Sequence, residues 1–586
     1  MLRTRSGYRL VVVQVMLLAL FGTLFARLWY LQVVGAETYQ AAAQDNAVRG
    51  IEITAPRGLI VDAMGRPLVA NRLSWVVTVD KDVLDAHSTS ARRAVLGRLA
   101  NTLGLTREEL KRRTKTCGEP GAAQPPICWN GSPYAPVPVA DDVPRVLAAS
   151  ILEQPEDYPG VTAEARTVRA YPSPLGVNAA HLLGYISPIT EDELDAAAAR
   201  GDETVSPLSV AGRSGLEAEY DRYLRGVSGV REVAVDSMGR VLGDAGEKQP
   251  QPGDILVTSI DAKVQALAER ELERSILSAR KTLDPVTGRN YAADAGSVVV
   301  MDATNGQLVA MASYPTYDPN MWVGGISQGD LDRLYSPQAD TPLLSRAMQG
   351  LFAPGSTFKP FTAAGALTSG YHTTDRLDCS SSLTVGGRVF KNYESAAYGP
   401  LTFAQALQLS CDTFFYRIAY AKWLAVGGDR EDTSIRDPLV ENAKDFGFGS
   451  KTGIDLPGEV DGRIADRQWK LAYWKANKDY YCKVGKEKGN DFLHVFAREF
   501  CLDGWNYRAG DAVNFAIGQG DTVLTPLQLA VAYAALSNGG TLWEPRVAKA
   551  VVDADGDLVK RIKPRASSSI PIPQRIVDYI DRALLG

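Results

Sequence analysis

The sequence predicts an α+β protein that carries one N-terminal membrane helix and is long enough to form two or three domains. The chain has 586 residues, whereas a single domain usually has about 100–200. An uncharged apolar run lies close to the N-terminus. Further along the chain, a helical pattern is followed by a hairpin pattern and then by several apolar helical stretches, an order that favours an α+β domain.

Composition excludes several classes of protein. Apolar residues make up 45% of the chain and charged residues 22%, which is ordinary for a globular protein and excludes wholesale disorder. The chain has 63 basic and 68 acidic residues, which excludes a strongly basic nucleic-acid-binding protein but leaves a local basic patch open. With only 4 His and 6 Cys, we do not expect a metal enzyme built on a histidine cluster.

Residues 10–34 are predicted to anchor the chain in a membrane, with residues 1–9 as a cytoplasmic tail. The uncharged run Leu10–Ala26 would span about 25 Å as a helix, slightly short of the ~30 Å hydrocarbon core. The following residues complete the span, and Trp29 and Tyr30 suit the interface. A cleaved signal peptide is the alternative, but no small-residue cleavage site follows the run. Three early arginines predict a cytoplasmic N-terminus and an extracytoplasmic body.

Four cysteines form two candidate disulfides. Cys117 and Cys128 flank a Gly/Pro-rich loop, and Cys482 and Cys501 bracket a Lys-rich stretch. Short loops of this kind suit disulfides in an oxidising compartment, which agrees with an extracytoplasmic body, although free thiols remain the alternative.

Cys379 and Cys411 are left over by that pairing. A zinc site that used them would need further ligands, and His372 is the one candidate nearby. We therefore predict no metal site.

The domain boundary is predicted at Gln249–Gly253, because Gln-Pro-Gln-Pro-Gly has the composition of a linker. Beyond it, Asp261 is expected to cap a helix that runs to about Arg280. The apolar runs 296–301 and 306–312, separated by Asp-Ala-Thr-Asn, predict a β-hairpin. The apolar face expected for the helix consists of Val264, Leu267, Ala268, Leu272 and Ile276.

The strongest chemical signal is the segment that begins Pro354-Gly355-Ser356 and ends at Lys359. Residues three apart share one face of a helix, and Pro-Gly suits a helix start, where the helix dipole favours developing negative charge. A serine attacks a carbonyl only if a base takes its proton, and a lysine can do so if burial lowers its pKa. A buried serine beside a snorkelling lysine is the alternative, because Ser-x-x-Lys occurs often by chance.

A second signal is Ser410-Cys411-Asp412, which follows the apolar helical stretch 401–409. Its hydroxyl could relay a proton to a leaving group, and its carboxylate could hold a lysine in place. On its own, this motif is more typical of a plain connection between two helices.

Together, these motifs give the chain a resemblance to the class B penicillin-binding proteins, the peptidoglycan D,D-transpeptidases, over almost its whole length. Ser-x-x-Lys is the nucleophile motif of that superfamily. The phrases similar to family signatures are Ala-Pro-Arg-Gly-Leu-Ile-Val-Asp at 55–62, Arg169-Ala170-Tyr171-Pro172, Gly212–Glu217, Arg346-Ala347 and Gly518-Gln519-Gly520. Ser-x-Asp and Thr452–Leu456 are more similar to the elongation enzymes than to the division enzymes, which usually carry Ser-x-Asn.

The resemblance implies an elongated pedestal, similar to a dimerisation domain, over residues 35–250. It implies a transpeptidase domain of the penicillin-binding and serine β-lactamase type over residues 251–586, with a central antiparallel sheet and helices. The pedestal is not preceded by a lysozyme-like glycosyltransferase module, so glycan polymerisation would fall to a partner, such as a SEDS-family glycosyltransferase.

The resemblance also implies the chemistry. The serine would attack the D-Ala-D-Ala carbonyl of a stem peptide on lipid II-derived glycan, and an amine from a neighbouring peptide would resolve the acyl-enzyme during cell-wall elongation. β-Lactams would acylate the same serine, and no cofactor is required. The residues implied are Ser356 as nucleophile, Lys359 as base, Ser410 as relay, Asp412 for positioning, and Gly355, Gly518, Gln519 and Gly520 for substrate binding.

Two departures from the family pattern matter. The third family motif, Lys-Thr/Ser-Gly on a strand, should follow Gly-Gln-Gly, but the sequence stops at Gly586 first. We therefore expect a C-terminal truncation that removes the last strands and lowers activity. Lys451-Thr452-Gly453 is expected to be a decoy, because it runs into Leu-Pro-Gly, which breaks a strand. The second departure is Asp412, whose carboxylate would raise the pKa of Lys359 unless burial offsets it.

Three alternatives stay open. The chain could be a division-specific transpeptidase. It could be a serine β-lactamase or carboxypeptidase that uses water in place of an amine, although a long anchored pedestal argues against this. It could also be a non-catalytic scaffold or a β-lactam sensor, although a sensor would need several membrane spans or a signalling domain.

Overall fold

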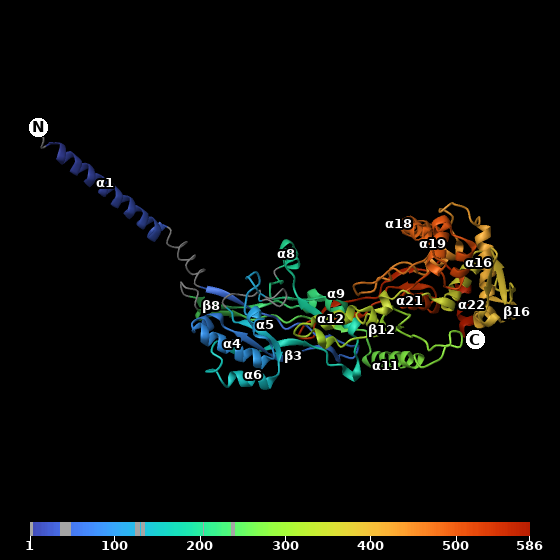
Figure 1. Ribbon diagram of the computed structural model, residues 1–586, viewed down its shortest axis with the longest axis horizontal. Helices are drawn as coiled ribbons and strands as arrows, with labels where there is room; N and C mark the ends of the chain where they lie inside the picture. The colour runs from blue at the N-terminus through green and yellow to red at the C-terminus, as the bar shows by residue number, and fades with distance from the viewer. Residues whose placement is uncertain are drawn as a thin grey trace.

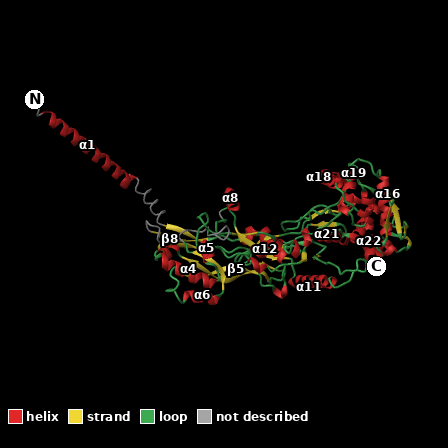
Figure 2. Cartoon of the chain, viewed as in Figure 1, coloured by secondary structure: helices red, strands yellow, loops and turns green. Residues whose placement is uncertain are grey.

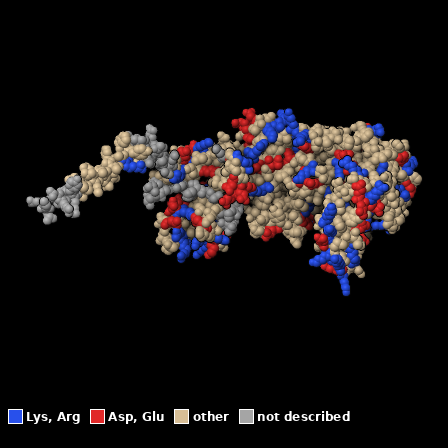
Figure 3. Space-filling view, turned by 90° about the horizontal axis from the view of Figure 1, so that it is seen from above, with Lys and Arg blue, Asp and Glu red and all other residues tan. Residues whose placement is uncertain are grey.

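The computed structural model describes residues 4–34, 48–122, 129, 135–202, 204–235 and 241–585. Their body is elongated, with the N-terminal third at one end and the helix-rich C-terminal region at the other (Figure 1). Strands run along the middle of the body, and helices dominate the end that holds the C-terminus (Figure 2). Acidic and basic side chains are interspersed over most of the visible face, with one Lys/Arg-rich projection towards the C-terminal end (Figure 3).

The N-terminal apolar run is helical, as expected. Helix α1 spans Thr4–Trp29 and continues into a π-helical turn, Tyr30–Val34. The segment Val11–Gln32 has a mean hydropathy of 2.1 and is not buried against the rest of the protein. Among the described residues it is the one helix long and apolar enough to cross a membrane.

The pedestal is built on a long strand, β3 (Pro67–Val79), which pairs with β4 (Val137–Val143) and, over ten residues, with β5 (Val161–Ala170). Buried residues of β3, β4, α4, α5 and α6 form one apolar core. Helices in this region are α3 (Lys81–Asp85), α4 (Thr89–Leu103), α5 (Arg107–Arg113), α6 (Arg145–Leu152), α7 (Ala180–Leu183), α8 (Glu191–Ala199), α9 (Gly215–Glu219) and α10 (Asp221–Leu224). A second sheet, in the order β1-β8-β9, joins Val48–Ile53, Gly229–Val235 and Val241–Lys248, and a short pair joins β6 (Ile186–Pro188) to β7 (Val210–Gly212).

A seven-stranded sheet crosses the boundary predicted between the domains. Its order is β19-β18-β10-β2-β3-β4, with β5 on β3. The added strands are β2 (Ile60–Val61), β10 (Ile255–Thr258), β18 (Ala548–Val552) and β19 (Leu558–Arg561). Within the predicted linker, Gln251 exchanges two backbone hydrogen bonds with Val227. The pedestal and the C-terminal region are therefore packed together through shared backbone pairing.

Three of the sequence phrases meet in one buried ion cluster. Glu217, fully buried, lies 2.6 Å from Arg57 Nε and 2.7 Å from Arg169 Nη2. Arg57 also lies 2.7 Å from Asp221. Burial alone would raise the pKa of Glu217, but the two arginines outweigh it and lower that pKa. Removing one member of such a cluster leaves buried charge without its full set of partners, so the cluster ties the three phrases to one another.

The predicted helix and hairpin are present. Asp261 caps α11 (Ala262–Ala279) by accepting from two backbone amides, and β11 (Gly296–Met301) pairs with β12 (Leu308–Tyr314). The buried face of α11 differs from the expectation: Gln265 is buried, and Leu267 is 48% exposed. Gln265 exchanges two hydrogen bonds with the backbone of β12, which satisfies its amide away from water.

The C-terminal region has a large apolar core rich in phenylalanine. Its helices are α12 (Gln328–Tyr335), α13 (Arg346–Gln349), α14 (Lys359–Thr368), α15 (Phe403–Gln408), α16 (Asp412–Ala425), α17 (Pro438–Asp445), α18 (Arg467–Lys486), α19 (Phe492–Asp503), α20 (Ala509–Ala516), α21 (Pro526–Ser537) and α22 (Gln574–Leu585). Its other strands form the pairs β13–β16 (Leu377–Cys379, Gly399–Leu401), β14–β15 (Ser382–Val385, Arg388–Lys391) and β17–β20 (Thr541–Trp543, Ala566–Ser569). Buried α21 contacts β11 and fixes the hairpin against this core.

Candidate active site

Ser356 and Lys359 lie on consecutive turns at the start of a buried helix. Gly355–Phe358 form one 3₁₀ turn, and α14 begins at Lys359. Ser356 is exposed, whereas Lys359 is only 1% exposed. The expected helix start therefore presents a hydroxyl to solvent and buries an amine directly behind it.

The Lys359 amine is held by three oxygen atoms of the second motif. Nζ donates to the Ser410 carbonyl oxygen at 2.6 Å, to Ser410 Oγ at 3.0 Å and to Asp412 Oδ1 at 2.6 Å. The Phe415 ring lies 5.9 Å away on the same helix as Asp412. Among the hydrogen bonds of the described residues, none joins Ser356 Oγ to Lys359. Such a bond often forms only when substrate is bound.

Burial decides the protonation tendency of the lysine. Desolvation lowers the pKa of Lys359, and although Asp412 acts in the opposite direction, the net shift is downward. As the sequence indicated, burial and Asp412 shift the pKa of Lys359 in opposite directions, and burial has the larger effect. A lowered pKa brings the neutral, proton-accepting form of the amine within reach at a pH closer to neutrality.

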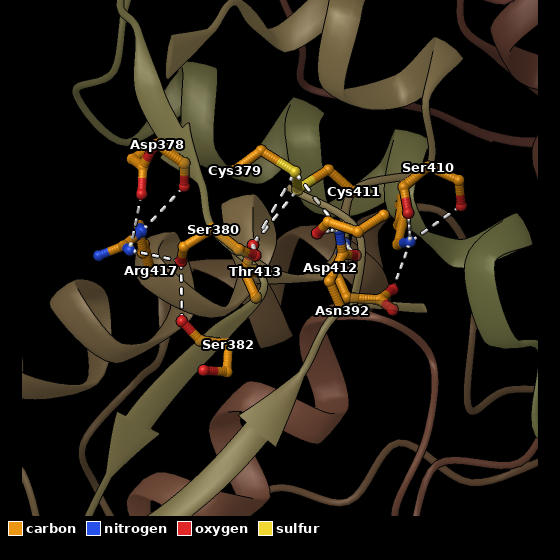
Figure 4. The surroundings of a disulfide bond; sticks show 12 residues. Asp378, Cys379, Ser380, Ser382, Asn392, Ser410, Cys411, Asp412, Thr413 and Arg417 are labelled. Atoms are coloured by element: carbon orange, nitrogen blue, oxygen red, sulfur yellow. Dashed lines mark hydrogen bonds and ion pairs between the residues drawn. A yellow bond between two sulfur atoms is a disulfide. The ribbon is translucent and has the colours of Figure 1, made fainter. Parts of the chain in front are cut away.

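A sharp turn delivers the second motif to the lysine. Helix α15 ends at Gln408, and Ser410 then adopts a left-handed conformation with φ of 51°. Cys411 follows as the N-cap of α16, and the Asp412 amide donates to Asn392 Oδ1 at 2.9 Å. Figure 4 shows Ser410 and Asp412 on either side of Cys411, whose sulfur is bonded to Cys379.

Gly518 packs directly against the nucleophile turn. The Gly355 amide donates to the Gly518 carbonyl at 2.9 Å. Gly518 has a φ of +67°, and a Cβ there would lie 2.6 Å from the Gly355 carbonyl oxygen. Gln519 and Gly520 are exposed beside this contact. The Gly-Gln-Gly phrase thus supports the turn that carries Ser356.

Lys451-Thr452-Gly453 lies in a loop, as the sequence indicated, and not on a strand. The Thr452 amide and hydroxyl both donate to Glu459 Oε1. Asp455, just beyond, accepts from two backbone amides of the 547–548 segment and from Tyr220 OH, and burial raises its pKa to about 6. This segment ties the loop to the sheet and to the pedestal.

The leftover cysteines form a disulfide with each other, which sequence reasoning missed. Cys379 and Cys411 are bonded and fully buried. Their separation of 32 residues carried no signal, because neither flanks a recognisable loop. Within the described residues, no group of three or more His, Cys, Asp or Glu side chains could hold a metal.

One of the two disulfides predicted from the sequence lies within the described residues. Cys482 on α18 is bonded to Cys501 on α19. Cys117 is disulfide-bonded, but Cys128 lies outside the described residues, so the pairing of these two remains a prediction.

The site holds an exposed serine one turn from a buried lysine, and that lysine contacts a second serine. This arrangement is typical of enzymes that act through a serine acyl-enzyme. Family comparison agrees. Residues 296–585 match the penicillin-binding protein transpeptidase domain, and residues 52–258 match the penicillin-binding protein dimerisation domain. The chain belongs to the penicillin-binding proteins, and its two matched domains make it a class B member.

Relatives cover most of the chain. It is 28% identical over 554 residues to the peptidoglycan D,D-transpeptidase MrdA of Escherichia coli. The aligned region covers 94% of this chain and 75% of that protein. It is similar to a structure from a peptidoglycan synthase complex (TM-score 0.62, 27% identity, covering 99% of this chain and 85% of the other). It shares the fold of the penicillin-binding protein PBP2 of Helicobacter pylori, solved with MreC (TM-score 0.66, 21% identity, 92% and 82% covered).

The comparisons do not show the expected truncation. The match to MrdA spans 94% of this chain and 75% of that protein, and the transpeptidase match extends to residue 585. The lower activity that was inferred from a truncation is equally without support.

Proposed function

We propose that the chain is a peptidoglycan D,D-transpeptidase of the elongation type, with Ser356 as the nucleophile. The observation that carries this proposal is that Lys359, one turn from an exposed serine, donates hydrogen bonds to Ser410 and Asp412. Kinship with MrdA over 94% of the chain supports the reaction and the elongation type.

The reaction follows from these positions. Neutral Lys359 takes the Ser356 proton as Oγ attacks the D-Ala-D-Ala carbonyl carbon. The bond to the terminal D-Ala breaks, and that D-Ala leaves with the proton held by Lys359, relayed through Ser410. An amine of a neighbouring stem peptide then attacks the ester and gives up a proton to Lys359, which passes it to Ser356 Oγ as the ester bond breaks. Water in place of that amine would make the enzyme a carboxypeptidase.

Localisation and partners follow from the anchor and the relatives. Helix α1 would cross the membrane once, with the N-terminus in the cytoplasm and the catalytic region outside. A SEDS-family glycosyltransferase would supply the glycan strands, and the relatives solved in a synthase complex and with MreC support protein partners of this kind. The pedestal over 35–250 and the transpeptidase region over 251–586 remain our proposed domain division.

Labelling tests the nucleophile. The full chain in detergent is incubated with labelled penicillin, digested and mapped, and the label is expected on Ser356. A label on another residue, or unchanged labelling of Ser356→Ala, would refute the assignment. A long-lived adduct supports a transpeptidase, whereas rapid turnover of the β-lactam would indicate a hydrolase.

A second substitution tests the base. Lys359→Arg keeps the positive charge but does not deprotonate near neutral pH. The folded variant should lose acylation almost completely. Near-normal acylation by a folded Arg variant would mean that another group takes the serine proton.

A further inference from the structure

We propose that the buried Cys379–Cys411 disulfide is a positioning element of the active site, which holds Ser410 and Asp412 at the distances where they grip Lys359. This inference rests on the proposed function, because it assigns the disulfide a part in the acylation of Ser356.

Cys411 lies between the two residues that contact the Lys359 amine. Among the described residues, the three oxygen atoms that accept from Lys359 Nζ belong to Ser410 and Asp412, on either side of Cys411. A displacement of Cys411 therefore moves every polar contact of the amine at once. The disulfide fixes Cys411, and the position of Cys411 determines where Ser410 and Asp412 meet Lys359 (Figure 4).

At its other end, the disulfide is anchored in a strand pair. Cys379 is the last residue of β13, where it pairs with Gly399 of β16, and its carbonyl accepts from the Tyr398 amide at 2.9 Å. The disulfide thus connects Cys411, the N-cap of α16, to the hydrogen-bonded pair of β13 and β16.

Weaker contacts join the same two segments as the disulfide. Thr413 Oγ1 donates to the Ser380 carbonyl at 2.8 Å. Asn392 accepts from the Asp412 amide and donates to Cys379 Sγ at 3.5 Å. The contacts of Thr413 and of the Asp412 amide join the 379–392 segment to the first turn of α16, and the bond from Asn392 to Cys379 Sγ ties that segment to the disulfide itself. The covalent bond lies among them and limits the movement that they alone would allow.

The backbone at Ser410 is in a conformation that its surroundings must hold. Ser410 has a φ of 51°, a left-handed value that a non-glycine residue keeps only where the surrounding structure fixes it. In this conformation both the carbonyl oxygen and Oγ of Ser410 face Lys359. Without the bond at the next residue, the turn is free to relax and to withdraw these two acceptors.

Loosening the turn has a measurable consequence beyond a slower rate. Asp412, from α16, is the charged partner of Lys359 among the described residues, and the Phe415 ring covers the same side. Water that enters beside a displaced Ser410 would relieve the desolvation that lowers the pKa of Lys359, and a displaced Asp412 would weaken the contact that raises it. The pH at which the acylation rate rises should therefore differ from that of the wild type.

The experiment compares two cysteine pairs in the same full-length protein. Cys379→Ala/Cys411→Ala removes the proposed positioning bond, and Cys482→Ala/Cys501→Ala is the matched control on α18 and α19. The second-order rate of acylation by a fluorescent penicillin is measured from pH 6 to 10 in detergent, together with the melting temperature. We expect the first pair to be acylated about 10- to 10²-fold more slowly near neutral pH, with its pH-dependent rise displaced from that of the wild type, and the control to match the wild type.

The outcomes separate the two proposals. A folded Cys379/Cys411 variant with the wild-type rate and pH profile overturns the positioning role. If that pair does not fold, Cys379→Val/Cys411→Ala, which keeps more of the buried volume, replaces it. Loss of the fold in both variants also overturns the role, because the bond would then serve the whole domain. Failure of the wild type to label at Ser356 would instead refute the proposed function.

Discussion

Asp412→Asn tests how the site balances burial against charge at Lys359. The Asp412 carboxylate lies 2.6 Å from Nζ, and the two side chains are 15% and 2% exposed. Asparagine has nearly the same shape and keeps an oxygen that accepts from the amine. The substitution therefore removes the negative charge while it leaves the hydrogen bond available.

The direction of the effect follows from the geometry. An opposite charge at this range favours the protonated amine, and here it raises the pKa of Lys359 against desolvation. Without it, the pKa of Lys359 falls further, so the neutral base appears at lower pH. Well below the midpoint, each unit multiplies the neutral fraction by about ten. The plateau at high pH should fall, because the neutral amine is then a weaker base.

The assay is the pH profile of the second-order rate of acylation by penicillin. We expect the rise in rate to move to lower pH in Asp412→Asn. Asp432→Asn, which changes an exposed aspartate that caps a turn after α16, is the matched control and should leave the profile in place. A profile that stays fixed, or that moves to higher pH, would refute the reasoning that Asp412 opposes burial at this amine.

Three further predictions follow from other contacts. Glu217→Ala should lower the free energy of unfolding by about 3–5 kcal/mol, because it removes the carboxylate that pairs with buried Arg169 and leaves Arg57 with Asp221 alone, and a normal chemical denaturation curve would contradict this. Gly518→Ala should slow acylation, because its Cβ would press on the Gly355 carbonyl oxygen beside the nucleophile. Acylation at the wild-type rate would show that the turn can shift at no cost. Lys451→Ala should leave the acylation rate unchanged, since its loop is held through neighbouring residues, and a large loss would mean that this lysine takes part in the site.

Local features of the site could be predicted from the sequence. The i, i+3 spacing of Ser356 and Lys359 depends on one helical turn, and the hairpin at β11 and β12 depends on residues close together in the chain. The cap at Asp261 was likewise predicted from its own neighbours. The buried face of α11 was not, because the strand β12 that packs on it decides which side is covered.

Contacts between distant segments could not be predicted in the same way. The Cys379–Cys411 bond depends on the packing of a strand pair against the start of α16, which no spacing rule gives. The net direction of the Lys359 pKa depends on how much water the folded core excludes, so the sequence could state the opposing effects but not their balance.

The sequence by itself determined the class of chemistry, the apolar anchor and the helix that presents Ser356, because each is encoded in residues that are neighbours along the chain. Only the tertiary structure brought Ser410 and Asp412, more than 50 residues away, onto Lys359. Only the tertiary structure joined Arg57 to Glu217 across 160 residues. The physical reason is that burial and charge pairing act through space, and their strength is set by the surroundings that the whole fold creates.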